Sequence, residues 1–227
     1  MKYIHAAIAS FLFAMLIALP SGEAVAESLA GKLQKSYEGV TSMRAEFTQV
    51  LLHKESGARE TRIGVLQFKK PLLVHWETKE PAEELLVVGK SEIWNVFPDE
   101  EVAYKYPLSI VEDTRSLVRV ITGQARLEQD FTFEEDGVED GLNKLLVYPK
   151  EPVQSLVEAI FWVDPQSGLI RKFRIYDFYG NENEITFSKQ KIGVSLSDSI
   201  FAYKPGKGIV VEDRTNMDST TQQPLLQ

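Results

Sequence analysis

Two histidines are the residues best suited to acid–base chemistry beyond the N-terminal stretch. His53 stands beside a polar loop, and His75 alternates with apolar residues in an expected strand. The chain has no cysteine, no Gly-x-Ser-x-Gly segment and no His-Glu-x-x-His helix, which would indicate nucleophilic or metal-assisted catalysis. Because a metal site needs a cluster of ligands, we interpret both histidines as surface residues.

Neighbouring carboxylates are more frequent and could in principle act as the acid–base pair of a glycoside hydrolase. They occur at Glu83-Glu84, Asp99–Glu101, Glu134–Asp136 and Glu139-Asp140. Each run lies at an expected strand end or turn, where charge keeps edges and loops soluble. By strand parity we expect no acid pair on the inner face, so the sequence favours a protein that is not an enzyme and needs no cofactor.

The formal net charge is −8, and no basic run occurs. Proteins that bind nucleic acid usually carry a basic surface. We therefore expect no nucleic-acid partner.

The N-terminus has the pattern of a secretory signal peptide. Lys2 precedes an apolar run over residues 6–19, and small residues follow up to Ala26. The alternative is a membrane anchor, but the run is shorter than the roughly 20 residues that a spanning helix needs. We expect cleavage after Ala26 and export of a soluble protein, with no cysteine to accept a lipid anchor.

Residues 64–76 show how the expected strands are patterned. Every second residue is large and apolar, while polar residues alternate with them. The apolar side chains on one face are Leu66, Phe68, Leu72, Val74 and Trp76. Pro71 removes a backbone donor at the centre of the stretch, so we predict two strands joined by a corner.

Similar runs separated by short turns follow along the chain, which predicts an antiparallel meander. Further strands are expected at 43–52, 85–88, 93–97, 102–106, 130–134, 142–148, 155–163, 169–177, 182–189 and 200–203. Amphipathic helices are expected over 28–38, ending near Gly39, and from the capping box Ser109–Glu112 to just before Gly123.

A sheet of about ten or eleven twisted strands usually curls or closes. We therefore predict a mainly β (α+β) fold, a curved and unclosed antiparallel β-barrel whose open apolar face is covered by the helices. The apolar face is either an ordinary packed core or a concave surface for an apolar ligand, and composition leaves both interpretations open.

The order of several short motifs resembles one known family. The matching residues are Phe47-x-Gln49, Gly64-x-Leu66, Phe68-Lys69-Lys70-Pro71, Trp76, Pro81, Gly89-Lys90, Ile93-Trp94, Pro98, Asp177-x-x-Gly180-Asn181, Ile185-x-Phe187, Phe201 and Pro205-x-x-Gly208-Ile209. Together they resemble the outer-membrane lipoprotein carrier family, LolA. Two departures are Lys70, where the family commonly has arginine, and Lys204-Pro205, where it has two prolines.

The resemblance implies a periplasmic carrier of triacylated lipoproteins. Its expected partners are an inner-membrane ABC lipoprotein exporter and an outer-membrane lipoprotein receptor. It also implies a monomer with one half-barrel domain over residues 27–214, between a signal peptide (1–26) and a polar tail (215–227).

On this interpretation, apolar residues of the sheet and of both helices line an acyl-binding cavity. They are Leu33, Tyr37, Phe47, Leu66, Phe68, Val74, Trp76, Leu117, Ile121, Val157, Phe161 and Phe173. Leu33, Tyr37, Leu117 and Ile121 would belong to the covering helices. Lys70 is a candidate for control of the lid or of cargo transfer, with a solvated corner residue as the alternative.

Three other functions stay open at this point. They are a periplasmic carrier of another lipid or glycolipid, a half-barrel sensor or regulator module, and a carboxylate hydrolase. A regulator of this kind would carry a second domain, and a hydrolase would place two partly buried acids in its cleft.

Overall fold

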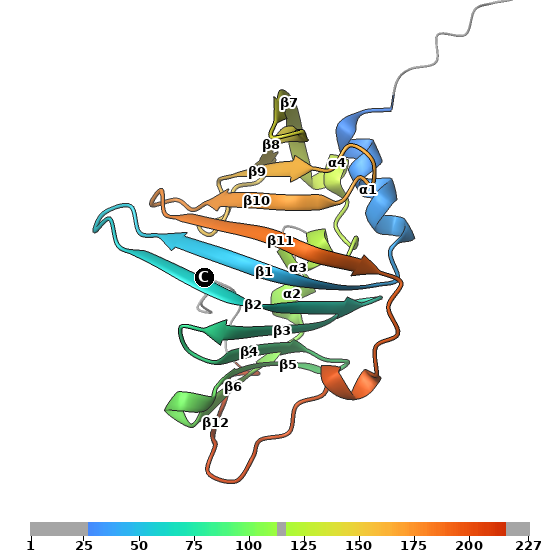
Figure 1. Ribbon diagram of the computed structural model, residues 1–227. Coiled ribbons are helices and arrows are strands. Elements are labelled where there is room, and N and C mark those ends of the chain that lie inside the picture. The colour runs from blue at the N-terminus through green and yellow to red at the C-terminus, as the bar shows by residue number, and fades with distance from the viewer. Residues whose placement is uncertain (1–26, 113–116, 217–227) are drawn as a thin grey trace, which may run out of the picture.

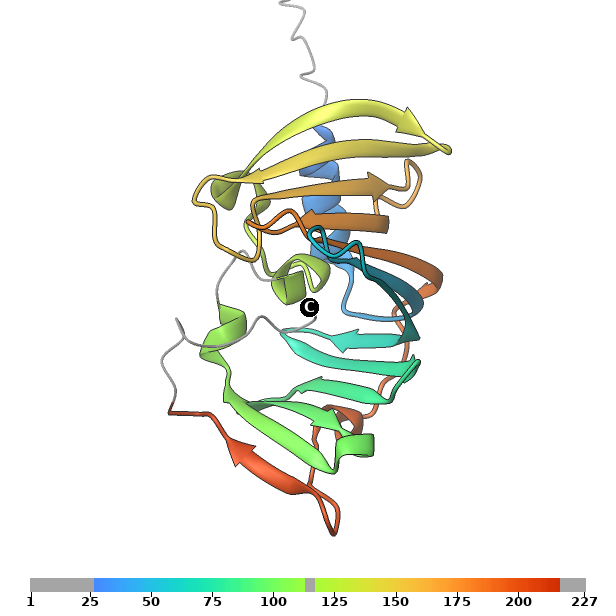
Figure 2. The same ribbon diagram turned by 90° about the vertical axis from the view of Figure 1, so that its left-hand side faces the viewer.

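The computed structural model describes residues 27–112 and 117–216, which form one curved sheet with helices on its concave side (Figures 1 and 2). The sheet has 12 strands in the order β12-β6-β5-β4-β3-β2-β1-β11-β10-β9-β8-β7. Its two edge strands, β12 and β7, do not pair with each other, so the barrel is not closed. The expected signal peptide and most of the expected tail lie outside the described residues.

The strands are β1 (Ser42–Leu52), β2 (Arg59–Lys69), β3 (Leu73–Glu80), β4 (Glu84–Val88), β5 (Glu92–Phe97), β6 (Val102–Pro107), β7 (Phe131–Glu139), β8 (Leu142–Pro149), β9 (Glu158–Val163), β10 (Ile170–Tyr176), β11 (Glu182–Ile192) and β12 (Val210–Asp213). The helices are α1 (Leu29–Gly39), α2 (Ser109–Glu112), α3 (Leu117–Ile121) and α4 (Leu127–Asp130), with 3₁₀ turns η1 (Pro98–Glu100) and η2 (Asp198–Phe201).

Two antiparallel meanders build the sheet, β1–β6 and β7–β11, and the first strand of one pairs with the last strand of the other. Phe47 of β1 lies opposite Phe187 of β11 and opposite Gly64 of β2. The link from β6 to β7 therefore joins the two far sides of the sheet, and it carries α2, α3 and α4 across the concave side (Figure 2). This confirms the predicted fold class.

Helix α1 forms as its sequence predicts. The hydroxyl of Ser28 accepts a hydrogen bond from the N–H of Gly31 at 3.0 Å, which satisfies one free donor of the first turn. Leu33 and Tyr37, four residues apart, lie on the buried face.

Glycine is required at position 64 of β2. A β-carbon there would lie 2.0 Å from the carbonyl oxygen of Glu77 and 2.6 Å from Cζ of Phe47. The Phe47 ring fills this space and packs against Trp76 with 4.4 Å between ring centroids. The glycine thus leaves room beside β2 for the ring of Phe47.

Apolar side chains are buried on both faces of the sheet. The larger cluster lies on the concave side, between the strands and the helices. A smaller one on the convex side contains Val87, Trp94, Val96 and Ala103. Tyr203 and Ile209 from the C-terminal segment pack against this smaller cluster.

The C-terminal segment differs from the prediction. The prediction of a strand at 200–203 is wrong, because these residues belong to η2 and the coil after it. Phe201 is buried there, and the carbonyl oxygen of Ile200 lies 2.8 Å from Nδ1 of His75. His75 is therefore half-buried rather than a free surface residue, whereas His53 is exposed as expected.

Four further elements also differ from the prediction. Strand β12 was not predicted, and it pairs with β6 in parallel. The expected helix before Gly123 is described as α2 and α3, with residues 113–116 between them undescribed, and α4 follows unpredicted. Strand β7 continues through Gly137, where a turn was expected, because the turn is made by Asp140-Gly141 instead.

Candidate functional site

The predicted sheet residues gather in the concave cluster. Phe47, Leu66, Phe68, Val74, Trp76, Phe161 and Phe173 are all buried in it. They come from five strands, β1, β2, β3, β9 and β10, that approach from both meanders. The alternation of apolar and polar residues thus correctly identified which side chains face inward.

The covering helices contribute to the same cluster. Leu33 and Tyr37 of α1 and Ile121 of α3 are buried there. Leu117 begins α3, but its side chain lies outside the described residues. Val111 of α2 and Ala125, after α3, also join the cluster, and these two residues were not among those predicted.

Val157 does not join the cluster, so its assignment to the inner face is wrong. Its side chain is 37 % exposed and precedes the first residue of β9. Val153 and Leu156 form a small β-bridge just before it, which interrupts the alternation of sides. Leu156 is buried in place of Val157.

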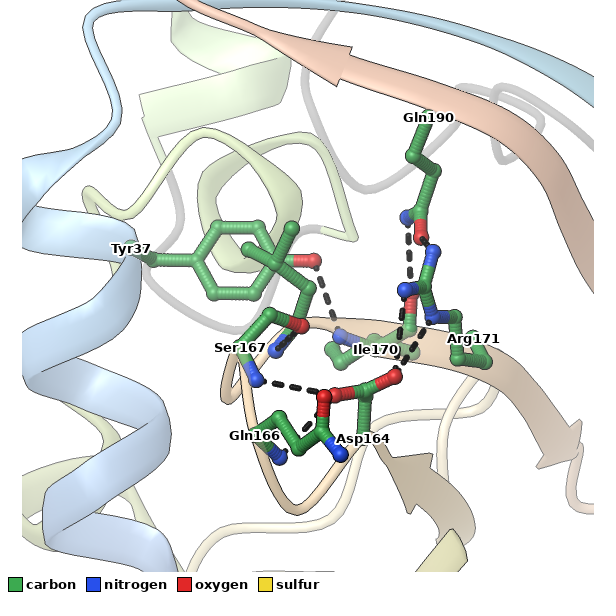
Figure 3. A network of polar contacts seen from close by, with 8 residues as sticks. Tyr37, Asp164, Gln166, Ser167, Ile170, Arg171 and Gln190 are labelled. Carbon is green, nitrogen blue, oxygen red and sulfur yellow. Dashed lines mark hydrogen bonds and ion pairs between the residues drawn. The ribbon is translucent and has the colours of Figure 1, made fainter.

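Tyr37 joins α1 to the sheet through a hydrogen bond (Figure 3). Its hydroxyl oxygen accepts the backbone N–H of Ile170 in β10 at 3.3 Å. Burial raises the pKa of the Tyr37 phenol far above its usual value, so the group stays neutral. Tyr37 is thus an anchor between α1 and β10.

The turn beside this anchor is held by Asp164 (Figure 3). Its carboxylate accepts the backbone N–H of Ser167 at 2.8 Å and pairs with the Arg171 guanidinium at 3.1 Å. These hydrogen bonds lower the pKa of Asp164 to about 2. The turn between β9 and β10 therefore presents a fixed surface to α1.

Lys70 contacts the C-terminus of α1. Its ammonium group donates hydrogen bonds to the carbonyl oxygens of Tyr37, at 2.9 Å, and Glu38, at 2.7 Å. Carbonyls of a last helical turn lack partners inside the helix and carry its partial negative charge, so a cation is favourable there. Lys70 is thus not a freely solvated corner residue.

Helix α1 and the segment after α3 also meet directly. Gly123 has a φ of +70°, and a β-carbon there would lie 2.6 Å from the carbonyl oxygen of Tyr37. The N–H of Leu127 donates to Oε1 of Gln34 at 3.1 Å. A cavity of about 10 Å³, room for about one water molecule, remains between these segments.

Polar contacts attach α1 to the sheet, and α2 and α3 pack on the apolar cluster. α1 is held to the sheet by polar contacts at both ends, since the N–H of Leu29 also donates to Glu135 of β7 at 3.0 Å. Helices α2 and α3 bury apolar side chains in the same cluster, among them Val111, Val118 and Ile121. Apolar packing of this kind is not directional.

One end of the concave face is polar. Gln49 and Thr78 are buried there, and Arg62 forms ion pairs with Glu60 at 2.6 Å and with Glu84 at 3.3 Å. Thr78 lies opposite Glu84 across β3 and β4, so one acidic residue, Glu84, faces inward, whereas the expectation concerned a pair of acids. The sequence contained one sign of this polar end, because Gln49 follows the inward-facing Phe47 by two residues and therefore also faces inward.

Within residues 27–112 and 117–216, no helix is long and apolar enough to cross a bilayer, and no group of three or more candidate metal ligands occurs.

Comparison with known proteins shows which family the chain matches. The family profile "Outer membrane lipoprotein carrier protein LolA" matches residues 38–204. An outer-membrane lipoprotein carrier protein of Methylococcus capsulatus is 25% identical over 185 residues, which cover 81% of this chain and 87% of that protein. The equivalent protein of Chromobacterium violaceum is 25% identical over 205 residues, 88% of this chain and 97% of its own.

The fold has a solved counterpart. An uncharacterized conserved protein from Thermus thermophilus superposes with a TM-score of 0.53 at 14% identity, over 82% of this chain and 97% of that one. The family profile covers most of the chain, from the end of α1 to the segment after η2. This chain therefore belongs to the outer membrane lipoprotein carrier family, LolA.

Proposed function

We propose that the protein binds the acyl chains of triacylated lipoproteins between its sheet and its helices and carries them across the periplasm. In this proposal residues 1–26 are a signal peptide, and residues 27–214 act as one domain. The protein receives its cargo from an inner-membrane ABC exporter and gives it to an outer-membrane receptor.

The observation that carries the proposal is the large apolar surface between the sheet and the helices that cover it. The concave cluster gathers Phe47, Trp76, Phe161 and Phe173 from both meanders. Burying a methylene group gains about 0.8 kcal/mol, so three acyl chains cannot cross water unshielded. Helices α2 and α3 cover the cluster through apolar contacts, and acyl chains can replace those contacts at little cost.

Release of a lipoprotein from inner-membrane spheroplasts tests the proposal. The mature protein is added, and the supernatant is examined for a soluble one-to-one complex by native mass spectrometry. A complex with a triacylated lipoprotein is the expected result. Bound lipid with no released lipoprotein would identify a carrier of another lipid, and an empty protein that releases nothing would refute the proposal.

A mutation inside the cluster refines this test. Val74 is completely buried, so Val74→Glu would leave a charge without water and disturb folding itself. Val74→Ala removes contact area and keeps the fold, with an expected cost of about 1–2 kcal/mol. A variant that is folded but releases less lipoprotein would support a direct contact between Val74 and acyl chains.

A further inference from the structure

Polar side chains cross the concave face in one row, close to the end of six neighbouring strands. We call these residues the polar row: Asn183, Gln49, Arg62, Thr78, Glu84 and Asn95. Gln49 lies opposite Arg62, and Thr78 lies opposite Glu84, so each pair shares a side of the sheet. Asn95 is opposite Leu86, a member of the concave cluster. The row thus borders the apolar face that the proposed cargo would occupy.

Hydrogen bonds hold the row in place. Nε2 of Gln49 donates to Oδ1 of Asn183 at 3.0 Å, and Gln49 is only 1% exposed. Nε of Arg62 donates to Glu60 at 2.6 Å. Oδ1 of Asn95 is buried and receives no hydrogen bond within the part of the chain that the structure describes. An unpaired buried acceptor is unfavourable, so this atom is ready to accept a donor from a ligand.

The row lies at the end of the sheet opposite to α1. The hairpins β1–β2, β3–β4 and β10–β11 lie at the polar end, on the left of Figure 1. Helix α1 lies at the other end, where Lys70 and the turn at Gly168 contact it. The concave face is therefore apolar and covered by α1 at one end, and polar at the end that α1 leaves uncovered.

We propose that the polar row binds the headgroup of the cargo and that the acyl chains point from it toward α1. The inference rests on the proposed function and adds an orientation and a headgroup class. The headgroup is uncharged and rich in amides and esters, such as the N-acyl, diacylglyceryl cysteine of a triacylated peptide.

The charges of the row favour this class over a phosphate. Arg62 is the one cation of the row, and Glu60 and Glu84 both pair with it. A phosphate would meet two carboxylates around an occupied guanidinium, and like charges at such distances repel. Asn and Gln offer both donors and acceptors, which match the N–H and carbonyl groups of an amide–ester core.

Pulsed electron paramagnetic resonance measures the orientation directly. Because the chain has no cysteine, one spin label can be placed through Glu55→Cys, in the β1–β2 hairpin, or through Gln166→Cys, in the β9–β10 turn. Both positions are exposed. The ligand is a synthetic triacylated cysteinyl peptide with a nitroxide on its peptide part.

We expect the nitroxide to lie closer to position 55 than to position 166. The strands between these ends are long, and 11 residues of β1 span roughly 35 Å. The expected difference therefore far exceeds the length of a spin-label linker. A nitroxide that lies closer to position 166, or equally far from both, would overturn the orientation.

A matched pair of variants tests the residues of the row. Asn183→Leu removes an amide at the polar end, and Asn143→Leu removes one from the same side of the sheet at the opposite end, where Asn143 lies opposite Val163. Affinity for the triacylated peptide should fall about fivefold in the first variant, the equivalent of one net hydrogen bond, and stay unchanged in the second. Affinity for a fluorescent long-chain hydrocarbon should stay unchanged in both. An equal loss in both variants would overturn the assignment.

Two lipids with the same acyl chains test the headgroup class. Dioleoylglycerol should bind more tightly than dioleoyl phosphatidic acid, and the reverse order would overturn the choice of an uncharged headgroup. If the triacylated peptide does not bind at all, the proposed function fails with the inference. If it binds in the opposite orientation, only the inference fails.

Discussion

Replacing Lys70 by methionine removes both hydrogen bonds from its ammonium group to the last turn of α1 while keeping most of the apolar side chain. The carbonyl oxygens of Tyr37 and Glu38 would lose a donor, and the helix end would lose a favourable charge. A hydrogen bond to a charged group contributes about 1.5–3 kcal/mol when buried, and a cation at a helix C-terminus about 0.3–1 kcal/mol. Lys70 is half-buried and its partners can turn to water, so we expect a total loss of about 1–2 kcal/mol.

Urea unfolding of the mature protein measures this loss as a fall in the free energy of unfolding. For a domain of this size the same change lowers the melting temperature by roughly 2–8 °C. Hydrogen exchange should accelerate most in α1, because the mutation releases the C-terminus of that helix before the rest of the fold.

Lys69→Met is the matched control. Lys69 is the neighbouring residue, and it pairs with Asp198 on the convex side at 2.6 Å, where both side chains are substantially exposed. Exposed ion pairs contribute about 0.2–1 kcal/mol. If Lys70→Met costs no more than Lys69→Met, or leaves exchange in α1 unchanged, Lys70 does not anchor the helix.

Three further predictions concern the same region. Gly123→Ala should lower the free energy of unfolding by about 2–4 kcal/mol in urea, because the added β-carbon clashes with α1 at a position whose positive φ is already strained for alanine. Gly141→Ala is the control: it has the same backbone strain and no clash, so it should cost about 1 kcal/mol. Equal losses in the two variants would contradict the contact between Gly123 and α1. Tyr37→Phe should cost about 1 kcal/mol, since it leaves the buried N–H of Ile170 without its acceptor, and an unchanged unfolding midpoint would refute that bond. The lowered pKa of Asp164 contributes stability that is complete above its ordinary pKa and disappears as the pH falls through about 2. Asp164→Asn should therefore weaken the pH dependence of the urea midpoint between about pH 4 and pH 2, and a curve identical to that of the unmutated protein would refute this account.

Alternation in the sequence predicted the inward-facing residues wherever strands are long and regular. Strands β2 and β3 are examples, because every second side chain of a regular strand faces the same side of the sheet. Their inward-facing residues are Leu66, Phe68, Val74 and Trp76. The same rule failed at Val157, where a short bridge interrupts the strand before β9.

Other features depend on contacts between distant segments and have no local signal. Ile200-Phe201 has the composition of a strand, yet it docks on the convex side through Phe201 and through the carbonyl oxygen of Ile200. Lys70 contacts the carbonyl oxygens of Tyr37 and Glu38, which precede it in the sequence by 33 and 32 positions. The local sequence indicates only that Lys70 is a cation beside a corner. The polar row likewise becomes visible only when the register aligns Gln49 with Arg62.

The pairing of β1 with β11 has a consequence for how the chain reaches this structure. Gln49 and Asn183 bond to each other across 134 residues of sequence. Most of the chain must therefore be present before the two meanders can join, and contacts of such long range slow folding. Because β11 follows β1 so late in the sequence, the edge of β1 that pairs with β11 stays unpaired until β11 is present. An unpaired strand edge is prone to aggregation, and the amides of β1 that face β11 should gain protection in pulse-labelling together with those of β11.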